Sequence, residues 1–327
     1  MEEKVEKIKI MELPIEIKRF IENKMNSLSN KELNENSRKI SINYRENDRS
    51  GKSLLNKENE AIAYAVSRMP ATFGAVSSAI ENVNKIYNLD IKKIADFGAG
   101  TGTASIAVNE MLSVEKINCF EREDAMIKVG KQIFKEYNDL ELKTEWKKFD
   151  ITKQNIEDKF DLVIASYMIN EVKEENFEEV INKMWNSTEK VLIIIEPGTV
   201  QGYRNIMKAK EILINNEAKI IAPCMSEKCK LPKEDWCNFS CRVQRSKIHK
   251  ETKGGEAPYE DEKYMYIAVG REKVENNKSR VIRHPLIYSG YVKLKLCTSE
   301  GIKEETVTKK DKEKFRIARK IKNGEII

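Results

Sequence analysis

The chain has 327 residues, of which 34% are charged and 40% are hydrophobic, and its formal net charge is +6. This length allows two domains, or one large domain with an appendage, around a substantial core. No apolar run approaches the length of a membrane span, and the first residues lack the basic and apolar regions of a signal peptide. We therefore expect a cytoplasmic protein that does not contact membranes.

The positive charge is concentrated in the C-terminal third. Residues 224–254 contain eight Lys and Arg against four Asp and Glu, and residues 309–327 contain eight against three. The rest of the chain must be slightly acidic to give the overall balance. An anionic partner such as RNA would therefore meet the C-terminal third.

Residues 1–90 predict a helical N-terminal cap. Apolar residues recur at helical spacing over residues 13–25, 58–68 and 72–87. Proline removes a backbone donor and crowds the preceding turn, so Pro70 predicts a break between the last two helices.

A glycine-rich turn follows this cap. Asp96, Gly98, Gly100 and Gly102 stand at alternate positions after an apolar run and before a helical one. Glycine tolerates positive φ and lets a ligand approach the main chain, so a strand, such a turn and a helix N-terminus form a small-molecule cradle. The spacing fits neither the dinucleotide fingerprint nor the P-loop. It resembles motif I of the class I S-adenosylmethionine (SAM) dependent methyltransferases.

From residue 91 to residue 272, short apolar runs alternate with helical segments. This alternation predicts an α/β domain with a parallel sheet and helices on both faces, as in the Rossmann-like class I methyltransferases. The predicted parallel strands are residues 93–97, 116–121, 141–147, 162–166, 191–196 and 218–222. Residues 263–269 are the candidate for a seventh, antiparallel strand.

Polar residues that follow the parallel strands are candidates for cofactor binding, because ligands in such sheets bind at the carboxyl ends of the strands. Glu121 ends the second strand, where a carboxylate can accept both ribose hydroxyls of a nucleoside. Asp150 follows the third strand, and methyltransferases often place an acid there to accept from the adenine amine. Ser166 ends the fourth strand at the same edge.

The acceptor side of this edge offers Tyr167, Asn170, Glu171 and Glu196 as candidates, without naming a catalytic residue. There is no Asn/Asp-Pro-Pro-aromatic motif after the fourth strand, and no cysteine at the rim for covalent cytosine methylation. Methyl transfer from a sulfonium can proceed by in-line positioning alone, so these absences do not exclude an enzyme.

A cysteine-rich insertion is predicted between the sixth and seventh strands, at residues 223–262. Cys224, Cys229, Cys237 and Cys241 fall within eighteen residues, in a segment with few apolar residues. In a reducing compartment clustered thiols more often hold metal than form disulfides, and a metal would supply folding energy. The spacing lacks the paired C-x2-C knuckles of most zinc sites, which favours an iron–sulfur cluster. Zinc and free thiols without a metal are the alternatives.

Residues 280–327 predict a basic extension. Residues 291–297 and 302–308 alternate like two strands of a hairpin, and residues 311–322 form a basic helical pattern. Its cysteine, Cys297, adds a further candidate thiol.

Several segments together resemble the methyltransferase-like proteins associated with the mitochondrial small ribosomal subunit and their bacterial and archaeal relatives. They are residues 68–72, the glycine-rich turn, and residues 196–199, 223–224, 235–237, 259–263, 283–285 and 296–301. This resemblance implies a SAM-binding domain with a structural [4Fe-4S] cluster. The ligands that it implies are Cys224, Cys229, Cys237 and Cys297, with Cys241 as the competing fourth thiol.

The resemblance also implies action on the small ribosomal subunit and its rRNA. We further expect a monomer that does not bind DNA. The implied enzyme is a SAM-dependent rRNA methyltransferase. The alternatives are a non-catalytic ribosome assembly factor with a zinc site and a small-molecule methyltransferase.

Overall fold

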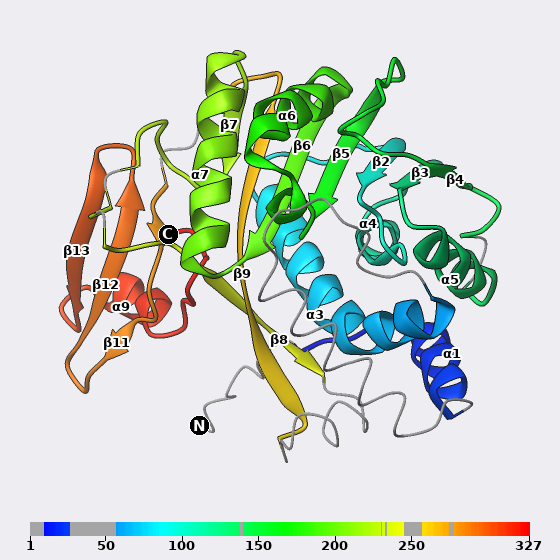
Figure 1. Cartoon of the computed structure of the whole chain (residues 1–327). Coiled ribbons are helices and arrows are strands. Elements are labelled where there is room, and N and C mark those ends of the chain that lie inside the picture. The colour runs from blue at the N-terminus through cyan, green and yellow to red at the C-terminus, as the bar shows by residue number, and fades with distance from the viewer. Residues whose placement is uncertain are drawn as a thin grey trace.

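The computed structural model describes residues 10–26, 57–137, 140–229, 231–232, 234–244, 257–274 and 278–327. A nine-stranded sheet with helices on both faces forms the main body, and a four-stranded sheet lies at one side of it (Figure 1). No helix within the described residues is long and apolar enough to cross a membrane.

Five parallel strands form the centre of the large sheet, which confirms the predicted α/β class. In spatial order they are β4 (Thr144–Lys148), β3 (Lys116–Glu121), β2 (Lys93–Phe97), β5 (Phe160–Ser166) and β6 (Thr188–Pro197). The chain moves outward from β2 to β4 and then returns to the other side of β2, so the strand order reverses between β2 and β5. Ligands of open α/β sheets bind at this switch point, at the carboxyl ends of the strands.

Beyond β6 the sheet continues with an antiparallel strand, β9 (Tyr259–Gly270). Strand β7 (Lys219–Ala222) pairs with the second half of β9, and β8 (Phe239–Gln244) pairs with its first half. The short β1 (Ile10–Met11) then adds in parallel to β8. The seventh strand therefore begins at Tyr259 rather than at residue 263, and part of the cysteine-rich insertion belongs to the main sheet.

The helices cover both faces of the large sheet. Helices α6 and α7 lie on one face, and α3 and α4 lie on the other (Figure 1). The bounds are α1 (Ile15–Asn26), α4 (Thr103–Met111), α5 (Asp124–Lys135), α6 (Phe177–Asn186) and α7 (Val200–Asn215), with two short 3-10 helices, η1 (Ile169–Glu171) and η2 (Glu174–Asn176).

Helix α3 (Glu58–Asn84) corrects one prediction, because it continues through Pro70. A proline inside a helix costs roughly 3 kcal/mol. The helix is buried on both sides of Pro70, as the full burial of Met69 and Ala75 shows. Burial of apolar side chains along the whole length of the helix offsets the loss of one backbone hydrogen bond.

The C-terminal unit has a small core of its own. Its elements are β10 (Arg280–Val281), β11 (Leu286–Ile287), β12 (Tyr291–Thr298), β13 (Gly301–Thr308) and α9 (Lys312–Ala318). Alternate β12 residues, Val292, Leu294 and Leu296, share this core with Phe315 and Ala318 of α9. The predicted hairpin is confirmed by the antiparallel pairing of β12 with β13, whereas the predicted helix is shorter and ends at Ala318.

Candidate functional site

A cavity of about 300 Å³ lies at the switch point of the large sheet. This volume is at the lower end of the range for small-molecule sites. Its floor is apolar and aromatic and its rim is charged. The lining residues that the argument uses are Phe97, Gly98, Gly100, Phe120, Glu121, Arg122, Phe149, Asp150, Ser166, Tyr167 and Glu171.

Two of the three predicted glycines line this cavity, and the third packs behind it. Gly98 and Gly100 both line it with positive φ, of 66° and 58°. Gly102 also has positive φ, but a Cβ there would lie 2.4 Å from the ring of Phe134. The loop therefore needs Gly98 and Gly100 to bring its backbone to the cavity, and Gly102 to pack helix α4 against α5.

Asp96 lies behind the glycine turn and does not line the cavity. Its Oδ2 accepts hydrogen bonds from the Ser105 backbone N–H, at 3.1 Å, and from the Ser105 hydroxyl, at 2.8 Å. Burial raises the pKa of Asp96 to about 7, against the opposing effect of these hydrogen bonds. Asp96 therefore holds the first turn of α4 in place behind the glycine turn. It would influence a bound ligand only by positioning that turn.

Glu121 lines the cavity at the end of β3. Its Oε2 accepts from the backbone N–H of Gly100 at 2.7 Å, and its Oε1 accepts from those of Arg122 and Glu123 at 2.8 and 2.9 Å. Burial raises the pKa of Glu121 while these three hydrogen bonds oppose the rise. The carboxylate therefore joins the glycine turn to the end of β3.

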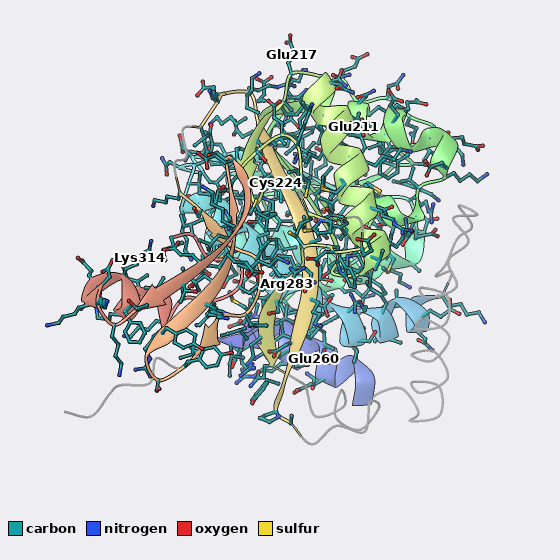
Figure 2. The ribbon with its side chains drawn as sticks, turned by 90° about the vertical axis from the view of Figure 1, so that its left-hand side faces the viewer. Glu211, Glu217, Cys224, Glu260, Arg283 and Lys314 are labelled. Atoms are coloured by element: carbon teal, nitrogen blue, oxygen red, sulfur yellow. The ribbon has the colours of Figure 1, made fainter. Side chains whose placement is uncertain are left out.

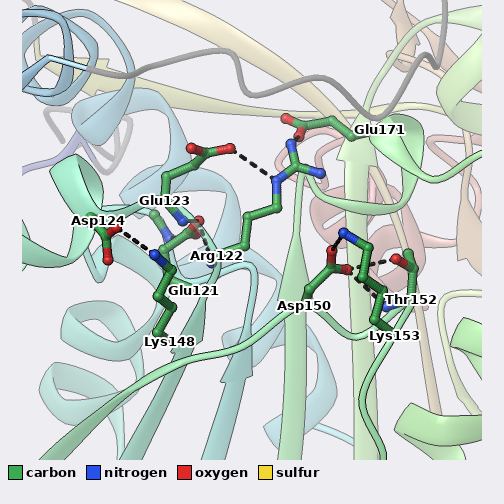
Figure 3. Close-up of polar contacts among 10 residues, drawn as sticks. Glu121, Arg122, Glu123, Asp124, Lys148, Asp150, Thr152, Lys153 and Glu171 are labelled. Carbon is green, nitrogen blue, oxygen red and sulfur yellow. Dashed lines mark hydrogen bonds and ion pairs between the residues drawn. The ribbon is translucent and has the colours of Figure 1, made fainter.

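Asp150 and Ser166 also line the cavity. The Asp150 carboxylate accepts from the Thr152 hydroxyl at 2.6 Å and pairs with Lys153 at 3.1 Å (Figure 3). Burial alone would raise the pKa of Asp150, but these hydrogen bonds outweigh it and lower the pKa. Asp150 is thus held ionised at the rim.

Arg122 is a cavity residue that the sequence analysis missed. Its guanidinium lies 3.0 Å from a carboxylate oxygen of Glu123 and 3.4 Å from one of Glu171 (Figure 3). Glu171, an acceptor-side candidate, is therefore held in an ion pair across the cavity mouth. In the sequence, only its position directly after Glu121 indicates that Arg122 lies at the cavity.

Tyr167 joins three separate parts of the chain at the rim. It has a positive φ of 57°, its hydroxyl donates to Glu262 of β9 at 3.0 Å, and Arg68 of α3 lies 5.3 Å from its ring centre. Arg68 also lies 3.4 Å from the same carboxylate oxygen of Glu262. A non-glycine residue with positive φ is rare and marks a backbone held by its surroundings. Arg68 and Glu262 do not line the cavity themselves, but the fold brings both to Tyr167, which does.

The other two acceptor-side candidates, Asn170 and Glu196, do not line the cavity. Glu196 is fully buried, its Oε1 has no hydrogen-bond partner among the described residues, and the Asn205 amide nitrogen lies 3.5 Å from its Oε2. Burial raises its pKa to about 8. The carboxyl group is therefore mostly protonated at neutral pH and lies in the interior of the protein.

A second, smaller cavity of about 20 Å³ lies between α7, the cysteine-rich segment and the C-terminal sheet. Cys224, Cys229, Cys237 and Cys297 all line it, although Cys297 is sixty residues beyond Cys237 in the sequence. Burial raises the pKa of Cys224, Cys237 and Cys297, and repulsion between the thiols adds to the rise.

Cys241 does not line this cavity. It lies on β8 with 7% of its surface exposed, and its Sγ would lie 3.1 Å from a Cβ at Gly74 of α3. Burial raises its pKa, and the nearby carboxylates of Glu262 and Asp261 add to that rise. The fold thus groups Cys297 with the other three thiols and packs Cys241 against α3.

The donor set of this cavity fits a thiolate-bound metal, because four cysteines can supply all the ligands of zinc or of an iron–sulfur cluster. Within the described residues, no three His, Cys, Asp or Glu side chains already converge at metal-binding distance. The thiols thus share a cavity without meeting at one point.

The C-terminal unit docks directly on the cysteine-rich segment. Asp235 pairs with Arg283 and with Lys295, whose Nζ lies 3.0 Å from its Oδ2, and Arg283 also donates to the Trp236 carbonyl at 3.1 Å. Figure 2 shows Cys224 and Arg283 at this junction, with Lys314 on α9 at the outer side of the C-terminal unit. These contacts bring Cys297 to the thiols of the preceding segment.

Comparisons with known proteins show the following similarities. The human mitochondrial ribosome assembly protein METTL17 is 22% identical over 291 residues, which cover 83% of this chain and 63% of that protein. This chain therefore matches less than two thirds of the length of that relative.

Two solved structures show distant likeness. Magnesium protoporphyrin IX methyltransferase from Synechocystis PCC 6803 is 14% identical, with a TM-score of 0.42, over 71% of this chain and 91% of that one. Ribosomal protein L11 methylase from Lactobacillus delbrueckii subsp. bulgaricus is 14% identical, with a TM-score of 0.37, over 61% of this chain and 78% of that one.

The family described as mitochondrial small ribosomal subunit Rsm22 matches residues 58–327, which include the glycine turn, both cavities and the C-terminal unit. The chain belongs to the Rsm22 family.

Proposed function

We propose that this protein is a SAM-binding, methyltransferase-like protein that acts on the small ribosomal subunit, in subunit assembly or rRNA methylation. The observation that carries the proposal is the cavity at the switch point, in a chain that belongs to the Rsm22 family. The matched relative named as a ribosome assembly protein supports the same assignment.

The chemistry of the cavity suits SAM, which combines a nucleoside with a positively charged sulfonium and amino group. Gly98 and Gly100 let a ligand approach the main chain, and the aromatic floor can pack against a purine. Glu121 would hold the ribose hydroxyls and Asp150 the adenine amine. The lining carries four acidic side chains against three basic ones, which leaves a small excess of negative charge for the cationic end of the ligand.

We propose that rRNA meets the C-terminal unit. Helix α9 and the residues that flank it expose a run of cations: Lys309, Lys310, Lys312, Arg316, Arg319, Lys320 and Lys322. Such a surface contacts phosphates without reading sequence, so binding should weaken steeply as the salt concentration rises.

We propose that Cys224, Cys229, Cys237 and Cys297 hold a structural [4Fe-4S] cluster, with zinc as the alternative. The shared cavity and the four-thiol donor set support this assignment. The bound centre would supply a crosslink between the cysteine-rich segment and the C-terminal sheet. Elemental and sulfide analysis of anaerobically purified protein separates the two metals, since stoichiometric zinc without sulfide would refute the cluster.

SAM binding is tested by titration calorimetry on matched glycine variants. A Cβ at Gly98 would lie 2.4 Å from Met168 Cγ in a residue with positive φ, whereas a Cβ at Gly290 meets nothing within 4 Å. We expect Gly98→Ala and Glu121→Ala to weaken SAM binding at least tenfold and Gly290→Ala to bind like wild type. Absence of SAM binding by the wild-type protein would refute the cofactor assignment.

Action on the ribosome is tested in cells that lack this protein. We expect fewer mature small subunits in gradient sedimentation, and association of the purified protein with small subunits at low salt. Mapping methylated nucleotides in the small-subunit rRNA then decides the mode of action. A lost methyl group identifies an rRNA methyltransferase, and an unchanged map identifies an assembly factor. Normal subunit levels without any association would favour a small-molecule methyltransferase.

A further inference from the structure

Two buried cations lie at the thiol cavity with no carboxylate paired to them among the described residues. Lys210 of α7 and Arg280 of β10 are each 1% exposed, and both line the cavity. The described lining of the cavity contains no Asp or Glu. Burial of unpaired charge costs several kcal/mol, so this arrangement calls for an anionic group in the cavity.

The contacts of Lys210 direct it toward the thiols. Its Nζ donates to the Ser226 carbonyl at 2.9 Å, and the side chain lines the same cavity as the Cys224 thiol. Among the described residues, Lys210 has no ion pair with a carboxylate. Its charge is therefore balanced by no protein group that the structure shows.

One hydrogen-bond donor of Arg280 has no acceptor among the described residues. Its Nε donates to the Pro223 carbonyl at 2.8 Å and its Nη1 to the Gly324 carbonyl, while Nη2 is buried with no hydrogen-bond partner among the described residues. A buried guanidinium donor without an acceptor is costly and rare. Since the side chain lines the thiol cavity, a ligand there would supply the missing acceptor.

Building on the proposed metal site, we infer that Lys210 and Arg280 are the charge-balancing residues of an anionic metal–thiolate centre. Four thiolates around Zn²⁺, or around an oxidised [4Fe-4S] core, leave a net charge of about −2, which two cations balance. Free thiols or disulfides are neutral and would leave both cations uncompensated. The two cations would therefore offset part of the cost of holding four buried thiolates around one metal centre.

The substitution Lys210→Met tests this inference, because it should affect the metal-free and the metal-loaded protein in opposite directions. In the metal-free protein, Lys210→Met removes an uncompensated charge, so the melting temperature should stay the same or rise. In the metal-loaded protein the same change removes half of the balancing charge, so a chelator should extract metal at least tenfold faster. Lys208→Met is the matched control, because Lys208 lies on the same helix with its side chain 40% exposed.

A second pair of variants, at Arg280, keeps the inference testable if Lys210→Met does not fold. Arg280→Gln should accelerate metal extraction as Lys210→Met does, and Arg280→Lys, which retains the charge, should lie closer to wild type. The inference is overturned if both neutral variants release metal at the wild-type rate. It is also overturned if Lys210→Met lowers the melting temperature of both forms equally, as loss of a merely structural hydrogen bond would.

Elemental analysis of the wild-type protein comes first. A wild-type protein without metal refutes the metal centre itself and, with it, this inference. If the wild-type protein holds metal, the variants alone decide the role of the two cations.

Discussion

The carboxylate of Asp235 and the guanidinium of Arg283 form an ion pair across the junction between the cysteine-rich segment and the C-terminal sheet. Lys295 of β12 binds the second carboxylate oxygen of Asp235 at 3.0 Å, so two cations of the C-terminal unit share one acid. Cys237 lies two residues after Asp235, and Cys297 lies two residues after Lys295. The junction therefore sets the position of two thiols at once.

Asp235→Asn should lower the free energy of unfolding of the metal-free protein by about 1 kcal/mol at pH 7, since the acid is 27% exposed and solvent weakens the pairs. Burial raises the pKa of Asp235, but Lys295 and Arg283 outweigh it and hold the pKa below 3.8. This stabilisation is present above pH 3.8 and is lost as the pH falls through the folded-state pKa.

Urea unfolding at pH 7 and in acid measures this effect. Asp158→Asn is the control, because Asp158 is 51% exposed and its ion pairs in the main body are 3.7 and 3.8 Å long. If Asp235→Asn and Asp158→Asn lose the same free energy of unfolding, the ion pair at the junction stabilises the protein no more than an ordinary surface pair does.

Cys297→Ser should release the metal, whereas Cys241→Ser should retain it. Cys297 lines the thiol cavity, and Cys241 packs against α3 outside it. Metal and sulfide content after anaerobic purification measures the difference. Loss of metal in Cys241→Ser with retention in Cys297→Ser would reverse the ligand assignment.

Gly102→Ala should destabilise the fold by about 2–4 kcal/mol, from overpacking and from strain at positive φ. An added Cβ would lie 2.4 Å from Phe134, in a residue with φ of 83°. Thermal unfolding beside Gly290→Ala, which should change little, measures the effect. A Gly102→Ala protein as stable as that control would show that α4 and α5 can separate freely.

Glu196 should make stability decrease as the pH rises. Burial raises its pKa from 4.5 to about 8, so the folded state holds a proton that the unfolded state releases. The contribution of protonated Glu196 to the free energy of unfolding is greatest below pH 4.5 and is lost as the pH rises toward about 8. The total loss is about 2–5 kcal/mol from the size of the shift.

Glu196→Gln keeps the shape without the titration, so its stability should vary less with pH between 5 and 8. Urea unfolding across this range compares the two proteins. Parallel curves would place the titration elsewhere, and Asp96, whose pKa is about 7, would then be the first alternative.

The sequence pattern predicted the parallel sheet closely but failed where distant packing decides local structure. The strands at residues 93–97 and 116–121 were placed as the structure has them, because a buried parallel strand is a continuous apolar run between turns. The pattern predicts a break at Pro70, and it assigns residues 259–262 to the cysteine-rich insertion before the seventh strand. In both cases packing against elements far along the chain outweighed the local preference.

The candidate cofactor site was only partly predictable for the same reason. Gly98, Gly100, Glu121 and Asp150 line the cavity as expected, because the ends of parallel strands meet at one edge. Asp96 and Glu196 stand at equally polar strand ends but point into the interior. Alternation along a strand sends neighbouring side chains to opposite faces, and the face that becomes buried depends on which helix covers it.

By itself, the sequence determined the parallel strands, the glycine turn and the identity of the thiols, since these follow from local patterns of apolar residues, glycine and cysteine. Only the tertiary structure decided that Cys297, rather than the nearer Cys241, joins Cys224, Cys229 and Cys237 around one cavity. Strand β8 turns Cys241 into the core, while the pairing of Asp235 with Arg283 and Lys295 docks the C-terminal sheet. Proximity between residues sixty positions apart is set by such docking contacts, which spacing along a chain does not encode.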